Sequence, residues 1–247
     1  MELDAFLQNN IYSWFLIFSR IAAAFAVIPC FGERIIPERV KLLIAALLAL
    51  AIYKTIGVYT VPVQVGDIVL ALISEILIGF SIGVVGRMLL SSIAYVGSIV
   101  SHTMMFNNSI SSAAGADPMP TIGTFLNLAA VTFLFSTDMH IMTIISIKNS
   151  YQLFPFGQMP NISILTDNVT DAFIAGFKVG VGMCVPFLLM GLVINTALGA
   201  VNRVMPNLPV FFVGTPALIA GGFIMLSATC VGLIENFGQL YIEWFGV

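Results

Sequence analysis

The sequence predicts an all-α polytopic membrane protein, and three observations point to this class. Only 9% of the 247 residues are charged and 59% are hydrophobic, whereas a soluble domain carries about 25% charged residues. The apolar residues form continuous runs, unlike the alternating strands of a membrane β-barrel. The 20 Phe exclude a disordered chain, because disorder goes with few aromatic residues.

Sparse charges divide the chain into about six apolar helices. No charged residue lies between Arg87 and Asp117, between Lys178 and Arg203, or between Arg203 and Glu235. Each interval exceeds the ~20 residues that a helix needs to cross hydrocarbon. The predicted helices cover about residues 11–31, 40–58, 68–88, 122–147, 172–198 and 210–235.

The third predicted helix can continue to about residue 106, bend, or form a hairpin arm, because residues 88–106 are also apolar. Two long loops are expected, at 107–120 and 152–171. Proline, glycine and small polar side chains accumulate there, and proline ends helices. The whole chain, residues 1–247, is expected to form one domain.

Lysine and arginine in short loops predict the orientation of the chain. Six crossings with the N-terminus outside place more basic residues inside than outside, which favours both termini on the outer side. Arg34 and Arg203 each precede a proline, Pro37 and Pro206, by three residues at a helix junction. The basic residues expected inside are Arg34, Arg39, Lys41, Arg87 and Arg203, and those expected outside are Lys54 and Lys148.

Small residues recur four positions apart on the predicted helices. Gly79 and Gly83 follow Glu75 at i+4 and i+8, and Gly176 and Gly180 form a second row. This spacing lets helix backbones approach closely, which is how helices associate in lipid. The rows therefore indicate packing and carry no chemistry of their own.

Arg20, Glu75 and Lys178 are charged residues inside predicted apolar helices. A charge at membrane depth is expensive and normally faces a partner or water. Arg20 and Glu75 have three readings: an intramembrane ion pair or coupling site, packing against polar groups of a neighbouring helix or subunit, or helices that lie outside lipid. Lys178 has a long apolar stem that can carry its ammonium group to the interface.

No set of residues suited to catalysis, metal binding or cofactor binding is found. Asp138 and His140 are i and i+2 on a predicted helix, so their side chains point to different faces. Cys30, Cys184 and Cys230 stand singly in apolar stretches, which fits buried small side chains. The sequence therefore predicts a protein that is not an enzyme and needs no metal or cofactor. The net charge of −3 also argues against a nucleic-acid partner.

Two blocks of the sequence resemble the FliR family of flagellar biosynthetic export proteins, which has SctT-like counterparts in injectisomes. They are GERIIPERVK at residues 32–41 and NTALGAVNRVMPN at residues 195–207. A looser third block is AGADP at residues 114–118. The resemblance extends over about residues 11–235. One departure is Lys148, which stands in a stretch that is normally apolar in the family.

The resemblance implies a non-enzymatic subunit of the type III secretion export gate, built of helical hairpins. In such a gate the FliR-like chain completes a hetero-oligomeric ring or spiral with FliP-like and FliQ-like subunits. A FlhB-like switch protein attaches near the basic inner side, and unfolded proteins pass through the channel. The resemblance places the gate in the bacterial inner membrane, largely above the bilayer plane, with buried charges facing neighbouring subunits. The alternative is a secondary transporter or channel for a small solute or ion, in which internal repeats are usual.

The resemblance also implies a plug, a loop that helps to close the channel before export. The matching segment is about residues 104–118, and apolar side chains there can close a pore by excluding water. Asp117 and Pro118 would hold the base of the loop, and the alternative is an ordinary connecting loop. The candidate plug residues are Met104, Met105, Phe106, Ile110, Asp117 and Pro118.

Overall fold

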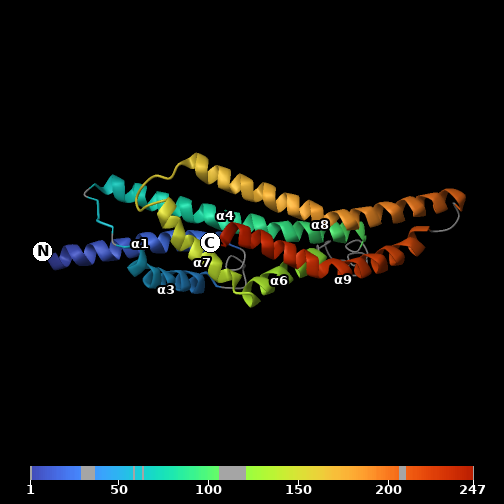
Figure 1. Ribbon diagram of the computed structural model, residues 1–247, viewed down its shortest axis with the longest axis horizontal. Coiled ribbons are helices and arrows are strands. Elements are labelled where there is room, and N and C mark those ends of the chain that lie inside the picture. Colours follow the sequence, from blue (N-terminus) through green and yellow to red (C-terminus); the bar gives the residue numbers. More distant parts are fainter. Residues whose placement is uncertain are drawn as a thin grey trace. The chain divides into compact units, whose positions relative to one another are not determined.

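The computed structural model describes residues 2–28, 37–57, 59–62, 64–105, 121–205 and 210–246, and this part of the chain contains helices and no strands. The all-α prediction is therefore confirmed. Figure 1 shows the helices coloured in chain order from blue to red. They are α1 (Glu2–Val27), α3 (Glu38–Ile56), α4 (Val65–Thr103), α6 (Thr121–Ser136), α7 (Met139–Leu153), α8 (Ile162–Val204) and α9 (Val210–Phe245).

Four of the described helices, α1, α4, α8 and α9, are long and apolar enough to cross a membrane. The bent pair α6 and α7 makes a fifth candidate if it counts as one span. Helix α3 does not qualify, because its 19 residues include four charged ones, Glu38, Arg39, Lys41 and Lys54. The membrane-protein class is confirmed, but fewer described helices qualify as spans than the six crossings assumed for the orientation.

Helix α4 takes the continuous form that the sequence left open. It runs unbroken for 39 residues and ends at Thr103. Arg87 lies in the middle of this helix with its side chain exposed. Its assignment to an inner loop was therefore wrong, since a residue inside one continuous helix belongs to no loop.

The single helix predicted over residues 122–147 is wrong, because the chain breaks it into α6 and α7. The two helices are bent by 73° relative to each other. Asp138 stands at the break with a φ of 57°, a left-handed conformation that aspartate tolerates better than most residues. A short polar side chain thus permits a sharp turn without proline or glycine.

The loop predicted over residues 152–171 is wrong in its second half, because α8 already begins at Ile162. The side-chain oxygen of Asn161 accepts the backbone N–H of Ser163 at 3.0 Å, as helix-capping residues do. The helix then continues for 43 residues, past Pro186. Helix α9 likewise runs to Phe245, ten residues beyond its predicted end.

Contacts divide the chain into two compact units, and the first comprises Met1–Met88, Asp138–Ile174 and Tyr241–Val247. Its core joins Ile17, Ile21 and Phe25 of α1 to Ala45 and Ala49 of α3, all buried. The two alanines are four residues apart and let α3 pack closely on α1, which lies beside it in Figure 1. This unit holds the polar cluster described below.

The second unit comprises Leu89–Thr137 and Ala175–Leu240. Here α4 and α6 cross so closely that a Cβ on Gly97 would overlap the backbone of Gly123. Each unit is assembled from separate stretches of the chain. That residues 1–247 form one domain remains a prediction.

Candidate functional site

Arg20 and Glu75 form an ion pair between α1 and α4, and neither side chain has any exposed surface. Arg20 Nε lies 2.6 Å from Glu75 Oε2, and Arg20 Nη2 lies 3.1 Å from Glu75 Oε1. The pair is therefore bidentate, which is the strongest arrangement of an arginine with a carboxylate. Of the three readings of these two residues, the structure places them in the ion pair.

The remaining polar atoms of the pair are bonded to α7 and the residues after it. Arg20 Nη1 donates to Ser150 Oγ at 2.9 Å, and Arg20 Nη2 donates to the Phe154 carbonyl at 3.1 Å. The Tyr151 hydroxyl donates to Glu75 Oε2 at 3.2 Å. The Arg20 guanidinium also lies 3.6 Å from the centre of the Tyr151 ring, a cation–π contact. We call Arg20, Glu75, Ser150, Tyr151 and the Phe154 carbonyl the arginine cluster.

Glycine residues bring the backbones of α1 and α4 close enough for the cluster to form. A Cβ on Gly79 would overlap the carbonyl oxygen of Arg20, and a Cβ on Gly83 would overlap that of Ala24. Glu75 stands one helical turn before Gly79 on the same face of α4, so its carboxylate meets Arg20 directly. The glycine row thus serves a contact within this chain.

A third glycine shapes the other side of the cluster. Gly157 has a φ of +68°, and a Cβ there would overlap the Tyr59 hydroxyl. Gly157 also lies near the Glu75 carboxylate. Only glycine fits this position without strain, because both the backbone conformation and the space exclude a side chain.

The arginine cluster is built to tie helices together. Burying two charges costs several kcal/mol per ion, which mutual attraction offsets only when the remaining donors and acceptors are also bonded. Here the bonds to Ser150, Tyr151 and Phe154 satisfy that condition. The cluster therefore joins α1, α4 and α7 at one point inside the first unit.

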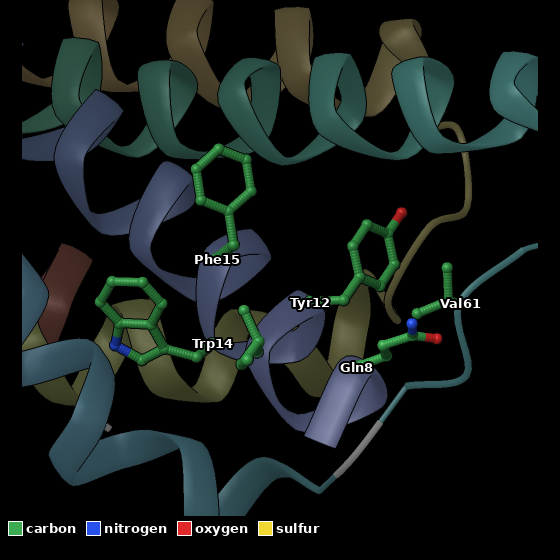
Figure 2. Close-up of a pocket in the computed structure, with 6 residues that line it drawn as sticks. Gln8, Tyr12, Trp14, Phe15 and Val61 are labelled. Atoms are coloured by element: carbon green, nitrogen blue, oxygen red, sulfur yellow. The ribbon is translucent and has the colours of Figure 1, made fainter. Parts of the chain in front are cut away.

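A pocket of about 360 Å³ opens on the N-terminal half of α1, and Figure 2 shows its lining. The rings of Tyr12 and Phe15 project toward the same side of the helix, and Val61 lies beside Tyr12. Asn9 holds this part of the chain, because its side-chain oxygen accepts the Val61 backbone N–H at 3.0 Å. The pocket is lined by Gln8, Ile11, Tyr12, Trp14, Phe15 and Val61, a set with no nucleophile–base pair or carboxylate.

The described residues contain no group of three side chains suited to a metal ion. Asp138 and His140 were expected on one helix. Asp138 instead forms the break before α7, and His140 lies inside α7. Cys184 is buried in α8, and Cys30 lies outside the described residues.

The candidate charge and packing residues of α8 have different surroundings. Lys178 is exposed on α8, so it is not buried within this chain, and its contact with another subunit stays a prediction. Gly176 and Gly180 are buried, and Gly180 faces Ser92 of α4 within the same unit. The second glycine row therefore also packs helices of one chain against each other.

The plug segment falls largely on residues 106–120, which lie outside the described part, together with Phe106, Ile110, Asp117 and Pro118. Met104 has no exposed surface, and its side chain fills the space beside Gly222 of α9. Met105 ends the helical turn with a φ of 53°. Met104 as a tip residue was therefore wrong, because a side chain packed in the core of the second unit does not project into a pore.

The basic inner-side residues are described only in part. Pro37 precedes α3, and its carbonyl accepts the N–H groups of Val40 and Lys41. Arg39 and Arg203 are exposed, and Lys41 is half-buried. Arg34 and Pro206 lie outside the described residues. A shared role for this set stays a prediction.

The sequence analysis missed Ser150, Tyr151 and the Phe154 carbonyl as partners of Arg20. They lie 130 or more residues away in the chain, at the end of a helix expected to finish near residue 147. The available signal was weak: Ser150 and Tyr151 add hydroxyls to the end of an otherwise apolar run. A buried arginine needs several acceptors, and such hydroxyls are the groups to search for.

Comparisons with known proteins agree on one family. The model of the family described as "Bacterial export proteins, family 1" matches residues 11–243. The flagellar biosynthetic protein FliR of Caulobacter vibrioides is 30% identical over 239 residues, covering 95% of this chain and 94% of the relative. FliR of Bacillus subtilis is 31% identical over 241 residues, covering 94% and 92%. FliR of Escherichia coli is 28% identical over 244 residues, covering 96% and 91%.

Proposed function

Because the chain belongs to the FliR family of bacterial export proteins, we propose that it is a core subunit of the flagellar export gate in the bacterial inner membrane. Its family and its apolar helices make it a membrane component of the flagellar export apparatus. In the proposed gate it forms, with FliP-like and FliQ-like subunits, the channel through which unfolded proteins pass. A FlhB-like switch protein binds near the basic inner edge. The match over residues 11–243 carries the proposal.

The surfaces of α8 and α9 support a subunit that has extensive neighbours. Only 28% of the spanning window of α8 and 22% of that of α9 are buried inside the chain, against 44% for α1. On α8, Leu189 and Leu192 are 57% and 62% exposed. Such surfaces need lipid or the helices of other subunits to cover them. In the proposed gate, FliP-like and FliQ-like subunits cover part of them.

The arginine cluster supports a subunit whose first unit is formed before assembly. The resemblance implied that Arg20 and Glu75 face neighbouring subunits, but both are paired inside this chain. That expectation was wrong, since neither side chain has surface left to offer a partner. In the proposed role the cluster fixes the shape of the subunit, and the segment 104–118 acts as the plug with Met104 as its buried anchor.

Co-purification tests the proposal. The tagged chain is extracted from membranes in a mild detergent, and the proteins that accompany it are identified by mass spectrometry. FliP-like and FliQ-like subunits are expected in near-constant ratio, and export of flagellar proteins is expected to stop when the chain is absent. A chain that purifies alone, restores export without those subunits, and is stabilised by a small solute would contradict the gate and support the transporter alternative.

A further inference from the structure

A second cavity, of about 300 Å³, opens in the first unit beside the arginine cluster. Helices α3 and α7 both end at it. Its lining includes the aromatic residues Tyr151 and Phe156 and the basic residue Lys148. The other lining residues are Thr55, Ile56, Asn149, Gln152 and Pro155. The lining therefore combines aromatic rings with an ammonium group, two side-chain amides and a threonine hydroxyl.

The exposed face of α3 is apolar between Arg39 in its first turn and Lys54 in its last turn, and the last turn lies at this cavity. Leu43, Leu47 and Leu50 are 60%, 57% and 54% exposed, and Lys54 follows on the same face in the last turn. The spacing of four, three and four residues keeps these side chains in one stripe. This pattern is typical of a helix that meets hydrocarbon along its length and lipid headgroups at its end.

The exposed face of α7 has the same pattern. Ile141 and Ile145 are 45% and 43% exposed, and they are followed on that face by the exposed Lys148 and Gln152. Helices α3 and α7 pack against each other. The C-terminal ends of both helices, with Lys54 and Lys148, thus lie at one cavity. In each helix the apolar stripe comes before the lysine in the sequence.

The charges at the cavity favour an anion. Its lining includes no carboxylate, and within the described residues the Lys148 ammonium has no ion-pair partner. The ring of Tyr151 already contacts the Arg20 guanidinium, so it is poorly placed for a choline-type cation.

We propose that this cavity binds the phosphate headgroup of an anionic phospholipid, with Lys148 as the main charge partner. Asn149, Gln152 and Thr55 supply further hydrogen-bond donors to the phosphate oxygens. The acyl chains lie along the apolar stripes of α3 and α7, which end at the cavity. The site is independent of the gate proposal, because it requires only the first unit and a membrane.

Native mass spectrometry of the full chain, purified with any subunits that accompany it, tests this site. Phosphatidylglycerol and phosphatidylcholine are titrated separately, and the bound lipid is counted. Lys148→Gln is expected to weaken phosphatidylglycerol binding about fivefold, since one lysine near anionic lipid contributes about 1 kcal/mol. Lys148→Arg should retain binding. Lys178→Gln removes another exposed lysine, which does not line the cavity, and is expected to behave as the wild type.

Three results would overturn the proposal. One is equal binding of phosphatidylglycerol by the wild type and Lys148→Gln. The second is equal retention of phosphatidylcholine and phosphatidylglycerol by the wild type. The third is loss of the lipid in millimolar inorganic phosphate alone, which would identify a site for soluble anions. None of these results would bear on the proposed export function, because failure of the lipid site leaves co-purification with FliP-like and FliQ-like subunits unchanged.

Discussion

Replacing Glu75 by glutamine should destabilise the first unit by removing a charge without changing the size of the side chain. Arg20 would then keep its positive charge with no exposed surface and no carboxylate. Breaking a buried ion pair on one side costs about 3–5 kcal/mol, because the remaining charge is uncompensated. Each 1.4 kcal/mol is about a tenfold change in an equilibrium constant, so the equilibrium constant for folding should fall by a factor of about 10² to 10⁴.

The measurement is thermal unfolding of the purified chain in detergent, together with protease resistance in membranes. A loss of this size corresponds to a fall in Tm of roughly 10 °C for a chain of this length. Glu243→Gln is the matched control, because it makes the same chemical change at an exposed position on α9. It is expected to leave Tm within about 2 °C, as most exposed substitutions do.

A double substitution separates the ion pair from simple loss of packing. Replacing a buried pair by apolar residues of similar volume is often neutral, or stabilising by about 1–4 kcal/mol. Arg20→Met with Glu75→Leu should therefore recover most of the stability that Glu75→Gln loses. The reasoning would be refuted if Glu75→Gln were as stable as Glu243→Gln, or if the double variant were less stable than Glu75→Gln.

Three further predictions concern the glycine row, the plug and the inner edge. Gly79→Ala should lower the free energy of unfolding by about 1–3 kcal/mol, because the added methyl group overpacks against the Arg20 carbonyl. In Gly232→Ala the methyl group meets open space, so Tm should stay equal or rise. Equal Tm values for the two variants would contradict the packing of Gly79 on Arg20. Deletion of residues 107–115 should leave the complex assembled but leaky, because water can wet a constriction that has lost its apolar atoms; normal ion conductance in resting cells would remove this segment as the seal. Neutralising Arg34 and Arg203 together should impair assembly or export while the chain still inserts, and normal export in this variant would exclude both residues from function.

Local chemistry determined most helix limits that the sequence analysis placed correctly. Pro37 marks the start of a helix, because proline has no backbone N–H to continue a preceding one, and α3 begins directly after it. The break at Asp138 carries no comparable signal, since aspartate adopts a left-handed φ only where the surrounding fold requires it. The early start of α8 at Ile162 was missed because the polar side chains that follow it suggested a loop. In the structure these side chains lie on a helix.

The sequence by itself determined the class, the family and the presence of close helix contacts. Long apolar runs with few charges have to be helices in a membrane, since no other single segment satisfies its own backbone there. The glycine rows also predicted close packing. A spacing of four residues shows which face of one helix is packed, but it does not identify the helix that packs against it. Only the tertiary structure decided that Gly79 faces Arg20 and that Glu75, 55 residues along the chain, is the partner of that arginine. Ser150 and the Phe154 carbonyl, still farther along the chain, complete the hydrogen bonding of Arg20. A buried guanidinium bonds to any acceptor that the fold brings within about 3 Å. Separation in sequence does not affect which acceptors these are.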